Sequence, residues 1–378
     1  MLLKGAKILG EDFILRKAEI KIKQGKIAAV GAISPDGCEE YSFDGKLIIP
    51  GLVDIHSHGC VGGDYSEGDP ESHRRMADYL ARNGVTAHLP TTMTLPEETL
   101  AAACAEAAEM AENGKGSRCL GIHLEGPYLS YDRRGAHNPQ YLRNPDPEEF
   151  ERLNRAAGGR IRLVSLAPEL PGAVEFIAAL KGKTTLSIAH TAGDYELGCK
   201  AFDAGANHLT HTFNAMTAFS HRQPGVIGAA ADCGAFAELI SDGIHVHPSM
   251  VRAAFRIFGE DRLTLISDSM AATGFRDGKY QMGGQEVTVK GPLATLADGT
   301  ISGSATNLFD CMKKAVSFGI PFEKAVKAAS FNPARSIGLD RTLGSIAVGK
   351  EADLVILNED LSIHRVMIGG AFYESENS

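Results

Sequence analysis

The stretch LIIPGLVDIHSHG, residues 47–59, constrains the fold of this chain more than any other. It opens with a near-continuous apolar run, which is typical of a strand buried on both faces in a parallel sheet. It closes with two histidines at alternate positions, and residues i and i+2 of a strand point to the same side. We therefore expect the imidazoles of His56 and His58 to project together, from a strand that starts at Pro50 and Gly51. Such a pair can hold a divalent metal, but alone it is as often a pair of core or surface histidines.

Composition and charge are those of an ordinary soluble globular protein, with 44% hydrophobic and 22% charged residues. The formal net charge of −9 argues against nucleic acid or an anionic membrane as partner. The net charge does not exclude an anionic small molecule as ligand, because a pocket needs only a few local cationic side chains to bind one. The odd number of cysteines, 7, without a CxxC spacing, indicates reduced thiols rather than a disulfide framework. The absence of a signal-peptide core and of any bilayer-length apolar run predicts a cytoplasmic protein.

Strand and helix patterns alternate through the centre of the chain. The strands are expected near 50–57, 85–92, 118–125, 162–167, 184–190, 207–212, 236–241 and 263–268. The helices are expected near 71–83, 96–112, 147–157, 172–181, 194–204, 248–258, 307–318 and 321–330. This alternation predicts an α/β fold, the (β/α)8 or TIM barrel, with a doubly wound open sheet as the alternative.

The two ends of the chain differ from this centre. Residues 1–49 and 339–378 contain short strands and tight turns, and neither segment is long enough for a stable sheet alone. We expect them to pair into one small β-sandwich domain, with the barrel, residues 50–338, inserted between them. A polar loop at 126–145 follows the third strand, and the glycine-rich segment 275–302 is expected to form an inserted β-hairpin.

Polar side chains stand at the carboxyl ends of five of the expected strands, where barrel enzymes carry their chemistry. In chain order they are His56 and His58, Glu125, His190, His211 and Asp268. Any one of them could be a buried polar group satisfied by a hydrogen bond. Because such polar side chains occur at five strand ends, we predict that they form one shared site.

These residues and several motifs carry a resemblance to a known family. The HxH pair, the two later histidines and the final aspartate resemble the amidohydrolase superfamily. Within it, the chain resembles the N-acetylglucosamine-6-phosphate deacetylase family over nearly its whole length. The motifs are HLEGPY (123–128), GAHN (135–138), AHT (189–191), HTFNAM (211–216), SDGIHV (241–246), ISDSMAATG (266–274) and SGSATNL (302–308).

The resemblance implies a divalent metal site. Many superfamily members bridge two metals with a carboxylated lysine on strand four, but 162–167 contains no lysine. In the resembled family a glutamate on strand three, here Glu125, takes that place, and a carboxylate can bridge because it has two oxygens. One or two metals per subunit are implied, and the nitrogen and oxygen donors favour zinc, with iron or manganese as alternatives. The implied metal ligands are His56, His58, Glu125, His190, His211 and Asp268.

The resemblance also implies the reaction, which is hydrolysis of the N-acetyl group of N-acetyl-D-glucosamine 6-phosphate in amino-sugar catabolism. Asp268 is expected to take a proton from the attacking water and pass it to the leaving amine, while His137 polarises the acetyl carbonyl. The phosphate is expected to meet the arginine fork of Arg222 across a homodimer interface. The implied substrate-binding residues are His137, Asn214, Ala215, Arg222 and His245.

Three other functions stay open at this point. The nearest is the same chemistry on N-acetylgalactosamine 6-phosphate, because the C4 epimer is not readable from these motifs. A cyclic amidase is less favoured, since the fourth strand has no lysine to carboxylate. A non-catalytic barrel that serves as an interaction scaffold is the third, and we would expect such a protein to have lost some of the ligand positions.

Overall fold

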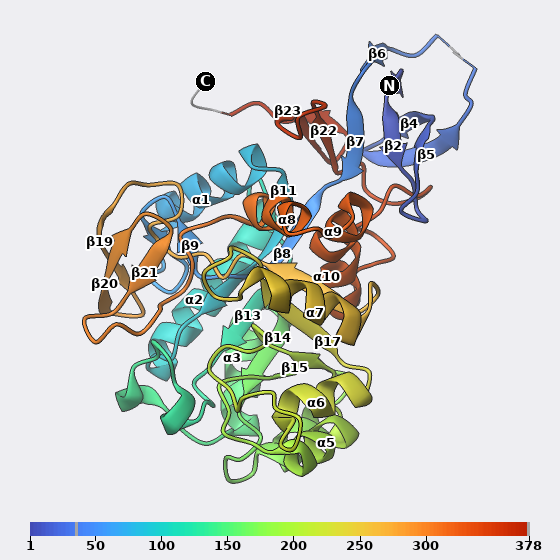
Figure 1. The fold of residues 1–378 in the computed structure, drawn as a ribbon. Coiled ribbons are helices and arrows are strands. Elements are labelled where there is room, and N and C mark those ends of the chain that lie inside the picture. The colour runs from blue at the N-terminus through green and yellow to red at the C-terminus, as the bar shows by residue number, and fades with distance from the viewer. Residues whose placement is uncertain (35–36, 376–378) are drawn as a thin grey trace.

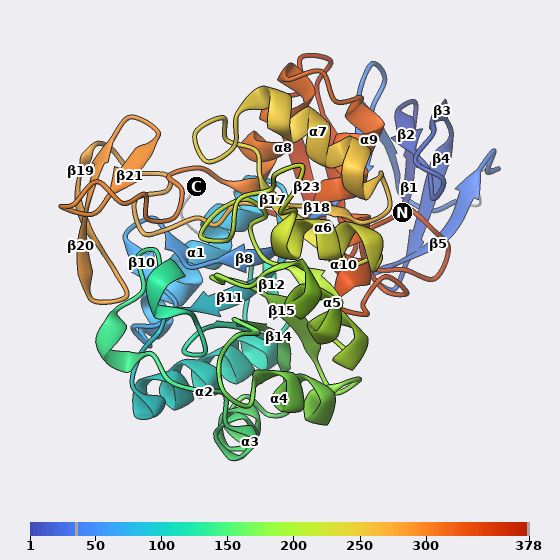
Figure 2. The same ribbon diagram turned by 60° about the horizontal axis from the view of Figure 1, so that its bottom comes forward.

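The computed structural model describes residues 1–34 and 37–375 and shows a barrel of parallel strands with helices around it (Figures 1 and 2). The strands follow one another around the barrel in chain order, as predicted for a TIM barrel. Within the described residues they are β8 (Leu52–Ser57), β11 (Val85–Thr92), β12 (Arg118–Cys119), β13 (Ile122–Glu125), β14 (Ile161–Leu166), β15 (Thr185–Ile188), β16 (His208–Leu209), β17 (Phe236–Ile240) and β18 (Leu263–Ile266).

The barrel closes between its last and first strands just beyond β18. The main-chain N–H of Asp268 donates to the carbonyl of His56 at 2.9 Å, and Ser57 and Ser269 form a parallel bridge. The buried carboxylate of Asp54 on β8 accepts the Ser267 hydroxyl from the other side of the same seam. Closure therefore brings the HxH pair and Asp268 to the same rim.

The helices cover the outside of the barrel and agree with the predicted ranges to within a residue or two. They are α1 (Pro70–Arg82), α2 (Glu97–Asn113), α3 (Pro147–Ala156), α4 (Ala173–Leu180), α5 (Tyr195–Ala204), α6 (Gly225–Asp232), α7 (Pro248–Phe258), α8 (Leu308–Ser317), α9 (Phe322–Ala329) and α10 (Phe331–Ser336). Helices α6 and α10 were not predicted. Most residues of α6 are buried, so its sequence lacks the amphipathic pattern from which a surface helix can be predicted.

The prediction of a single strand that begins at Pro50 was wrong. Pro50 ends β7 (Leu47–Pro50), which belongs to another sheet, and β8 begins only at Leu52. The chain passes from one sheet to the other at Gly51, where a Cβ atom would lie 2.1 Å from the Thr86 hydroxyl oxygen. Only glycine allows the backbone to approach the neighbouring strand this closely.

The two ends of the chain meet in one sheet, since β22 (Leu354–Leu357) runs antiparallel to β7. This six-stranded sheet has the order β24-β23-β22-β7-β2-β3, and a four-stranded sheet has the order β5-β4-β1-β6. Both contribute to one apolar core that includes Leu3, Ile8, Ile20 and Ile356. The sheets form the small β-domain, whose limits at 49 and 339 stay predictions. The remaining strands are β1 (Leu2–Lys4), β2 (Lys7–Leu9), β3 (Leu15–Lys17), β4 (Glu19–Lys23), β5 (Lys26–Gly31), β6 (Glu40–Ser42), β23 (Ile363–Ile368) and β24 (Ala371–Phe372).

The inserted segment after β18 is a three-stranded antiparallel sheet rather than the expected two-stranded hairpin. Its strands are β19 (Gly278–Met282), β20 (Gln285–Lys290) and β21 (Leu293–Thr295). Figures 1 and 2 both show it on the opposite side of the barrel from the terminal strands. We call this inserted segment, residues 275–302, the flap. The Gln285 side chain donates to the carbonyl of Ala136, which ties the flap to the loop after β13.

Two further short strands, β9 (Gly59–Cys60) and β10 (Gly63–Asp64), follow β8, and two 3₁₀ helices, η1 (Tyr131–Arg133) and η2 (Pro139–Tyr141), lie in the loop after β13. In the part of the chain that the structure describes, no helix is both long and apolar enough to cross a membrane.

Candidate active site

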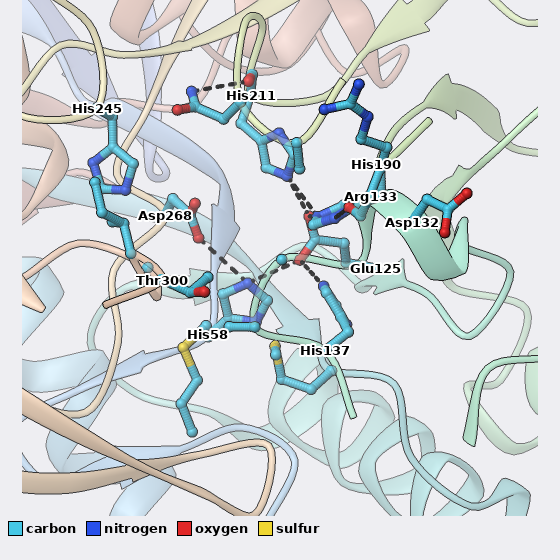
Figure 3. Close-up of a pocket in the computed structure, with 18 residues that line it drawn as sticks. His58, Glu125, Asp132, Arg133, His137, His190, His211, His245, Asp268 and Thr300 are labelled. Carbon is cyan, nitrogen blue, oxygen red and sulfur yellow. Dashed lines mark hydrogen bonds and ion pairs between the residues drawn. The ribbon is translucent and has the colours of Figure 1, made fainter. Parts of the chain in front are cut away.

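A cavity of about 310 Å³ opens at the carboxyl ends of the barrel strands and contains most of the residues predicted for the site (Figure 3). The flap covers one side of it through Met282, Thr300 and Ile301. Figure 3 shows the side chains of His58, His137 and His211 pointing toward Glu125. The predicted residues that line it are His58, Glu125, His137, His190, His211, Asn214, Ala215, His245 and Asp268.

Glu125, at the end of β13, lies at the centre of this cluster. Its Oε1 is 2.9 Å from Nε2 of His211 and 3.3 Å from Nε2 of His190. Its Oε2 is 3.1 Å from Nε2 of His58 and 3.3 Å from Nε2 of His137. All of these side chains are buried. A single carboxylate therefore contacts imidazoles from three different strand ends and one from the loop after β13.

The HxH pair forms a second group that shares this carboxylate. The Nε2 atoms of His56 and His58 lie 3.3 Å apart. Nε2 of His56 is 3.5 Å from Oε1 of Glu125. Asp268 Oδ1 lies 3.4 Å from His58 Nε2 and 3.6 Å from His56 Nε2. The two histidines thus face the same side, as the period of a strand requires.

The donor set fits divalent cations. In each group two imidazole Nε2 atoms approach one another beside a carboxylate oxygen, at 3.3 Å for His56 and His58 and at 2.9 Å for His190 and His211. His56, His58 and Glu125 offer ligand atoms that all lie within 4.8 Å of one another, and so do Glu125, His137 and His190. Nitrogen and oxygen donors of this kind suit zinc, iron or manganese.

Hydrogen bonds to Nδ1 distinguish His56 and His190 from His137. Nδ1 of His56 faces the carboxylate of Glu238 at 2.9 Å, and Nδ1 of His190 faces the carbonyl oxygen of Arg133 at 2.8 Å. An acceptor at Nδ1 requires the proton there, which leaves the Nε2 lone pair for a cation. His137 is opposite, because the main-chain N–H of Thr94 donates to its Nδ1 at 3.2 Å.

The tautomer of His137 therefore places its proton on Nε2, the atom that faces Glu125. Burial lowers the pKa of His137 to about 4, so the ring is neutral at pH 7. A neutral ring with its Nδ1 occupied is a hydrogen-bond donor at Nε2 and has no lone pair there for a metal. This geometry separates His137 from the other histidines of the cluster.

Asp268 is held as a carboxylate. Burial raises its pKa, but the charge of His56 and the hydrogen bond with His58 outweigh burial and bring the pKa down to about 2. Burial likewise opposes ionisation of Glu125, and the charge of His56 with the hydrogen bonds from the other histidines lowers its pKa well below the usual value. Both carboxyl groups are therefore ionised at neutral pH.

Three residues of the cluster have left-handed backbone conformations that non-glycine residues rarely adopt. The φ angles are 42° at His190, 26° at His211 and 48° at Asp268. Each follows a barrel strand, and such strain, of order 1–3 kcal/mol for each residue, concentrates at functional sites. The strain aims side chains from the ends of three strands into one cavity.

Only some of the residues expected to bind the substrate line the cavity. His245 lines the cavity, with its Nδ1 at 2.7 Å from a carboxylate oxygen of Asp242. Asn214 and Ala215 also line it, but the Asn214 main-chain N–H donates to the His211 carbonyl. Arg222 is exposed and is not among the residues that line the cavity.

Sequence reasoning missed Glu238, Thr94 and Arg133. Glu238 is a fully buried glutamate within the apolar strand FAELI, and a charge in such a strand was the available signal. Thr94 gave no signal, because its role depends on a turn after β11. Arg133, from the polar loop after β13, is the only lysine or arginine among the described residues that line the cavity.

The chain is similar to proteins of one family over almost its whole length. The profile described as "Amidohydrolase family" matches residues 47–372. An N-acetylglucosamine-6-phosphate deacetylase from Bacillus subtilis is 38% identical over 375 residues, which cover 96% of this chain and 94% of the relative. An N-acetylgalactosamine-6-phosphate deacetylase from Escherichia coli O157:H7 is 36% identical, and the match covers 97% and 98% of the two chains.

A solved structure is similar at the same level. The N-acetyl-D-glucosamine-6-phosphate deacetylase of Mycobacterium smegmatis superposes with a TM-score of 0.93 at 35% identity, covering 99% of this chain and 100% of the other. A mutant of the Mycobacterium smegmatis enzyme in complex with N-acetyl-D-glucosamine-6-phosphate has a TM-score of 0.92 at 35% identity and covers 98% of each chain.

Proposed function

The chain belongs to the amidohydrolase family, and from this premise we propose that it hydrolyses N-acetyl-D-glucosamine 6-phosphate to D-glucosamine 6-phosphate and acetate in amino-sugar catabolism. One observation carries the proposal. Two buried pairs of histidines, His56 with His58 and His190 with His211, share the carboxylate of Glu125 beside an open cavity. A barrel that served only as a scaffold would have no need to keep this arrangement. We place the enzyme in the cytoplasm.

We propose two cations per subunit, with zinc favoured. His190 and His211 with Glu125 form one site, and the HxH pair with Glu125 and Asp268 forms the other. The expected ligand set excludes His137, because the Thr94 N–H occupies its Nδ1 and leaves a proton on Nε2. A divalent cation in such a site lowers the pKa of water and acts as a Lewis acid toward a carbonyl.

The protein side chains then divide the proton chemistry between them. Asp268, ionised and at the rim of the cavity, takes the proton of the attacking water and later gives it to the leaving amine. His137 donates its Nε2 hydrogen to the acetyl oxygen as negative charge develops there. The Thr94 main-chain N–H keeps His137 oriented through its hydrogen bond to Nδ1 at 3.2 Å, which leaves the Nε2 hydrogen for the acetyl oxygen.

The second candidate is the same reaction on N-acetylgalactosamine 6-phosphate, since a relative named for that sugar is nearly as similar as the first. Acetate release from both sugar phosphates and from both sugars without phosphate tests the choice. We expect the highest kcat/KM with N-acetylglucosamine 6-phosphate. A higher value with the galactosamine epimer would transfer the assignment to that substrate, and no acetate from any of them would refute the proposed function.

We propose that Arg222 completes the phosphate site from the partner in a homodimer, because it is exposed and lies outside this chain's own cavity. A charge-assisted hydrogen bond contributes about 1.5–3 kcal/mol, so Arg222→Ala should lower kcat/KM by roughly 10- to 150-fold. The loss should be much smaller for a substrate without phosphate. Arg341→Ala, which removes another exposed arginine, is the control and should leave kcat/KM unchanged.

Mixing two impaired variants tests whether Arg222 acts across the interface. A heterodimer of Asp268→Asn and Arg222→Ala subunits has one site with both defects and one with neither, because a two-fold interface is shared by equivalent sites. Activity should therefore rise above that of either parent once subunits exchange. No rise, with exchange verified, would return Arg222 to its own subunit. A third variant, Arg133→Ala, is measured beside them. If Arg133→Ala lowered kcat/KM for the phosphorylated substrate and Arg222→Ala did not, Arg133 rather than Arg222 would bind the phosphate.

A further inference from the structure

Glu238, on β17, is a charged side chain that the proposed reaction leaves without a task. It is fully buried, and it lies inside the barrel wall behind the cavity rather than in it. Its Oε2 accepts a hydrogen bond from Nδ1 of His56 at 2.9 Å and from the main-chain N–H of His211 at 3.1 Å. One oxygen thus contacts a member of each group of candidate ligands.

Among the described residues, no lysine or arginine bonds to the Glu238 carboxylate. Within residues 1–34 and 37–375 its Oε2 bonds only to His56 and His211. Its Oε1 makes no hydrogen bond, and Nδ1 of His208 lies 3.7 Å from it. An ionised carboxylate in such a place is costly unless a cation compensates it. A metal ion held by Nε2 of His56 would supply that compensation from the far side of the ring.

The contacts of Glu238 also fix geometry at both ligand groups. The carboxylate holds the proton of His56 on Nδ1, so that Nε2 presents its lone pair toward Glu125. The side chain and the main-chain carbonyl of Glu238 accept the N–H groups of His211 and Thr212, the latter at 2.9 Å. These bonds hold the turn in which His211 has its left-handed φ of 26°.

We propose that Glu238 is a positioning residue that commits His56 to a cation through Nε2. This inference rests on the proposed metal-dependent function. A carboxylate behind a histidine ligand orients the ring and makes it a stronger donor, and its loss usually weakens metal binding by about 10- to 100-fold. His190 has only a main-chain carbonyl behind it, so the charge effect is specific to the His56 site.

The test compares Glu238→Gln with Thr264→Val. Thr264 pairs with Glu238 in register on the next strand, is fully buried, and its hydroxyl has no hydrogen bond among the described residues, so its loss is a matched control. Glutamine keeps the size and an acceptor oxygen but removes the charge. Zinc affinity of stripped protein is measured by competition with a chromophoric chelator, zinc content by elemental analysis, and metal-free stability by thermal unfolding.

We expect Thr264→Val to match the parent, and Glu238→Gln to bind zinc at one site about 10- to 100-fold more weakly. The metal-free melting temperature of Glu238→Gln should stay near that of the parent. In a His56→Asn background the Glu238→Gln change should cause no further loss of affinity, because the ring through which it acts is gone.

Unchanged zinc affinities with a lowered metal-free melting temperature would overturn the inference and leave Glu238 a structural residue. A loss of affinity that persists in the His56→Asn background would also overturn it. A parent protein that binds no zinc, iron or manganese would instead refute the proposed function. If Glu238→Gln does not fold, Glu238→Asp, whose shorter side chain withdraws the carboxylate from His56, is judged by the same criteria.

Discussion

Replacement of Asp268 by asparagine should lower kcat by about 10²- to 10⁴-fold, the usual contribution of a positioned acid or base. Asparagine has nearly the same shape but cannot accept the proton of the attacking water. The parent side chain is ionised at neutral pH, so it can accept that proton. We expect KM to change little, because the substrate contacts come from other residues. Steady-state kinetics of acetate release measure both quantities.

Asp261→Asn is the matched control for this experiment. Asp261 precedes β18 and Asp268 follows it, so the two aspartates stand at opposite ends of one strand. Asp261 is exposed and its partner is Lys327, far from the cavity. The control should retain the parent rate. An Asp268→Asn enzyme within threefold of the parent kcat would show that another group carries the proton.

Replacement of Glu125 by glutamine should be the most damaging single change in the metal site. The carboxylate contacts every imidazole of the cluster, and the amide offers a single acceptor oxygen in place of two charged ones. Breaking a buried charge pair costs about 3–5 kcal/mol, which corresponds to roughly 150- to 4,000-fold weaker metal binding. Elemental analysis after gel filtration should find the variant depleted of metal and acetate release lost with it.

Glu149→Gln separates this effect from general destabilisation. Glu149 is also a buried glutamate, but it lies on α3 and its partner is Arg143. We expect this control to lower the melting temperature and to retain the metal. If Glu125→Gln kept its full metal content and its activity, Glu125 would not bridge the site.

The barrel and the rim residues were accessible to sequence reasoning because their signals are local. A strand of period two aims His56 and His58 to one side, and parallel strands end at a common rim, which gathers Glu125 and Asp268 there. The amphipathic helices could be read from spacing alone. The proposed roles of the rim residues depend in addition on family resemblance.

The parts that sequence reasoning missed depend on contacts between distant segments. The break at Gly51 exists because Thr86 of the neighbouring strand passes within contact distance. Glu238 acquires its partner His56 only when the barrel closes and brings β8 beside β18, the strand next to β17. The tautomer of His137 is decided by a main-chain N–H at Thr94, more than forty positions away in the chain. No local pattern encodes these relations.

The central claim is that acetate release from N-acetylglucosamine 6-phosphate depends on cations held by this cluster. The direct measurement strips the enzyme with a chelator, verifies by elemental analysis that the metal is gone, and records acetate release as zinc, iron or manganese is restored in increments. We predict no activity in the metal-free enzyme and a rise in proportion to bound metal until the sites are full. Full activity in protein shown to be metal-free would contradict the account.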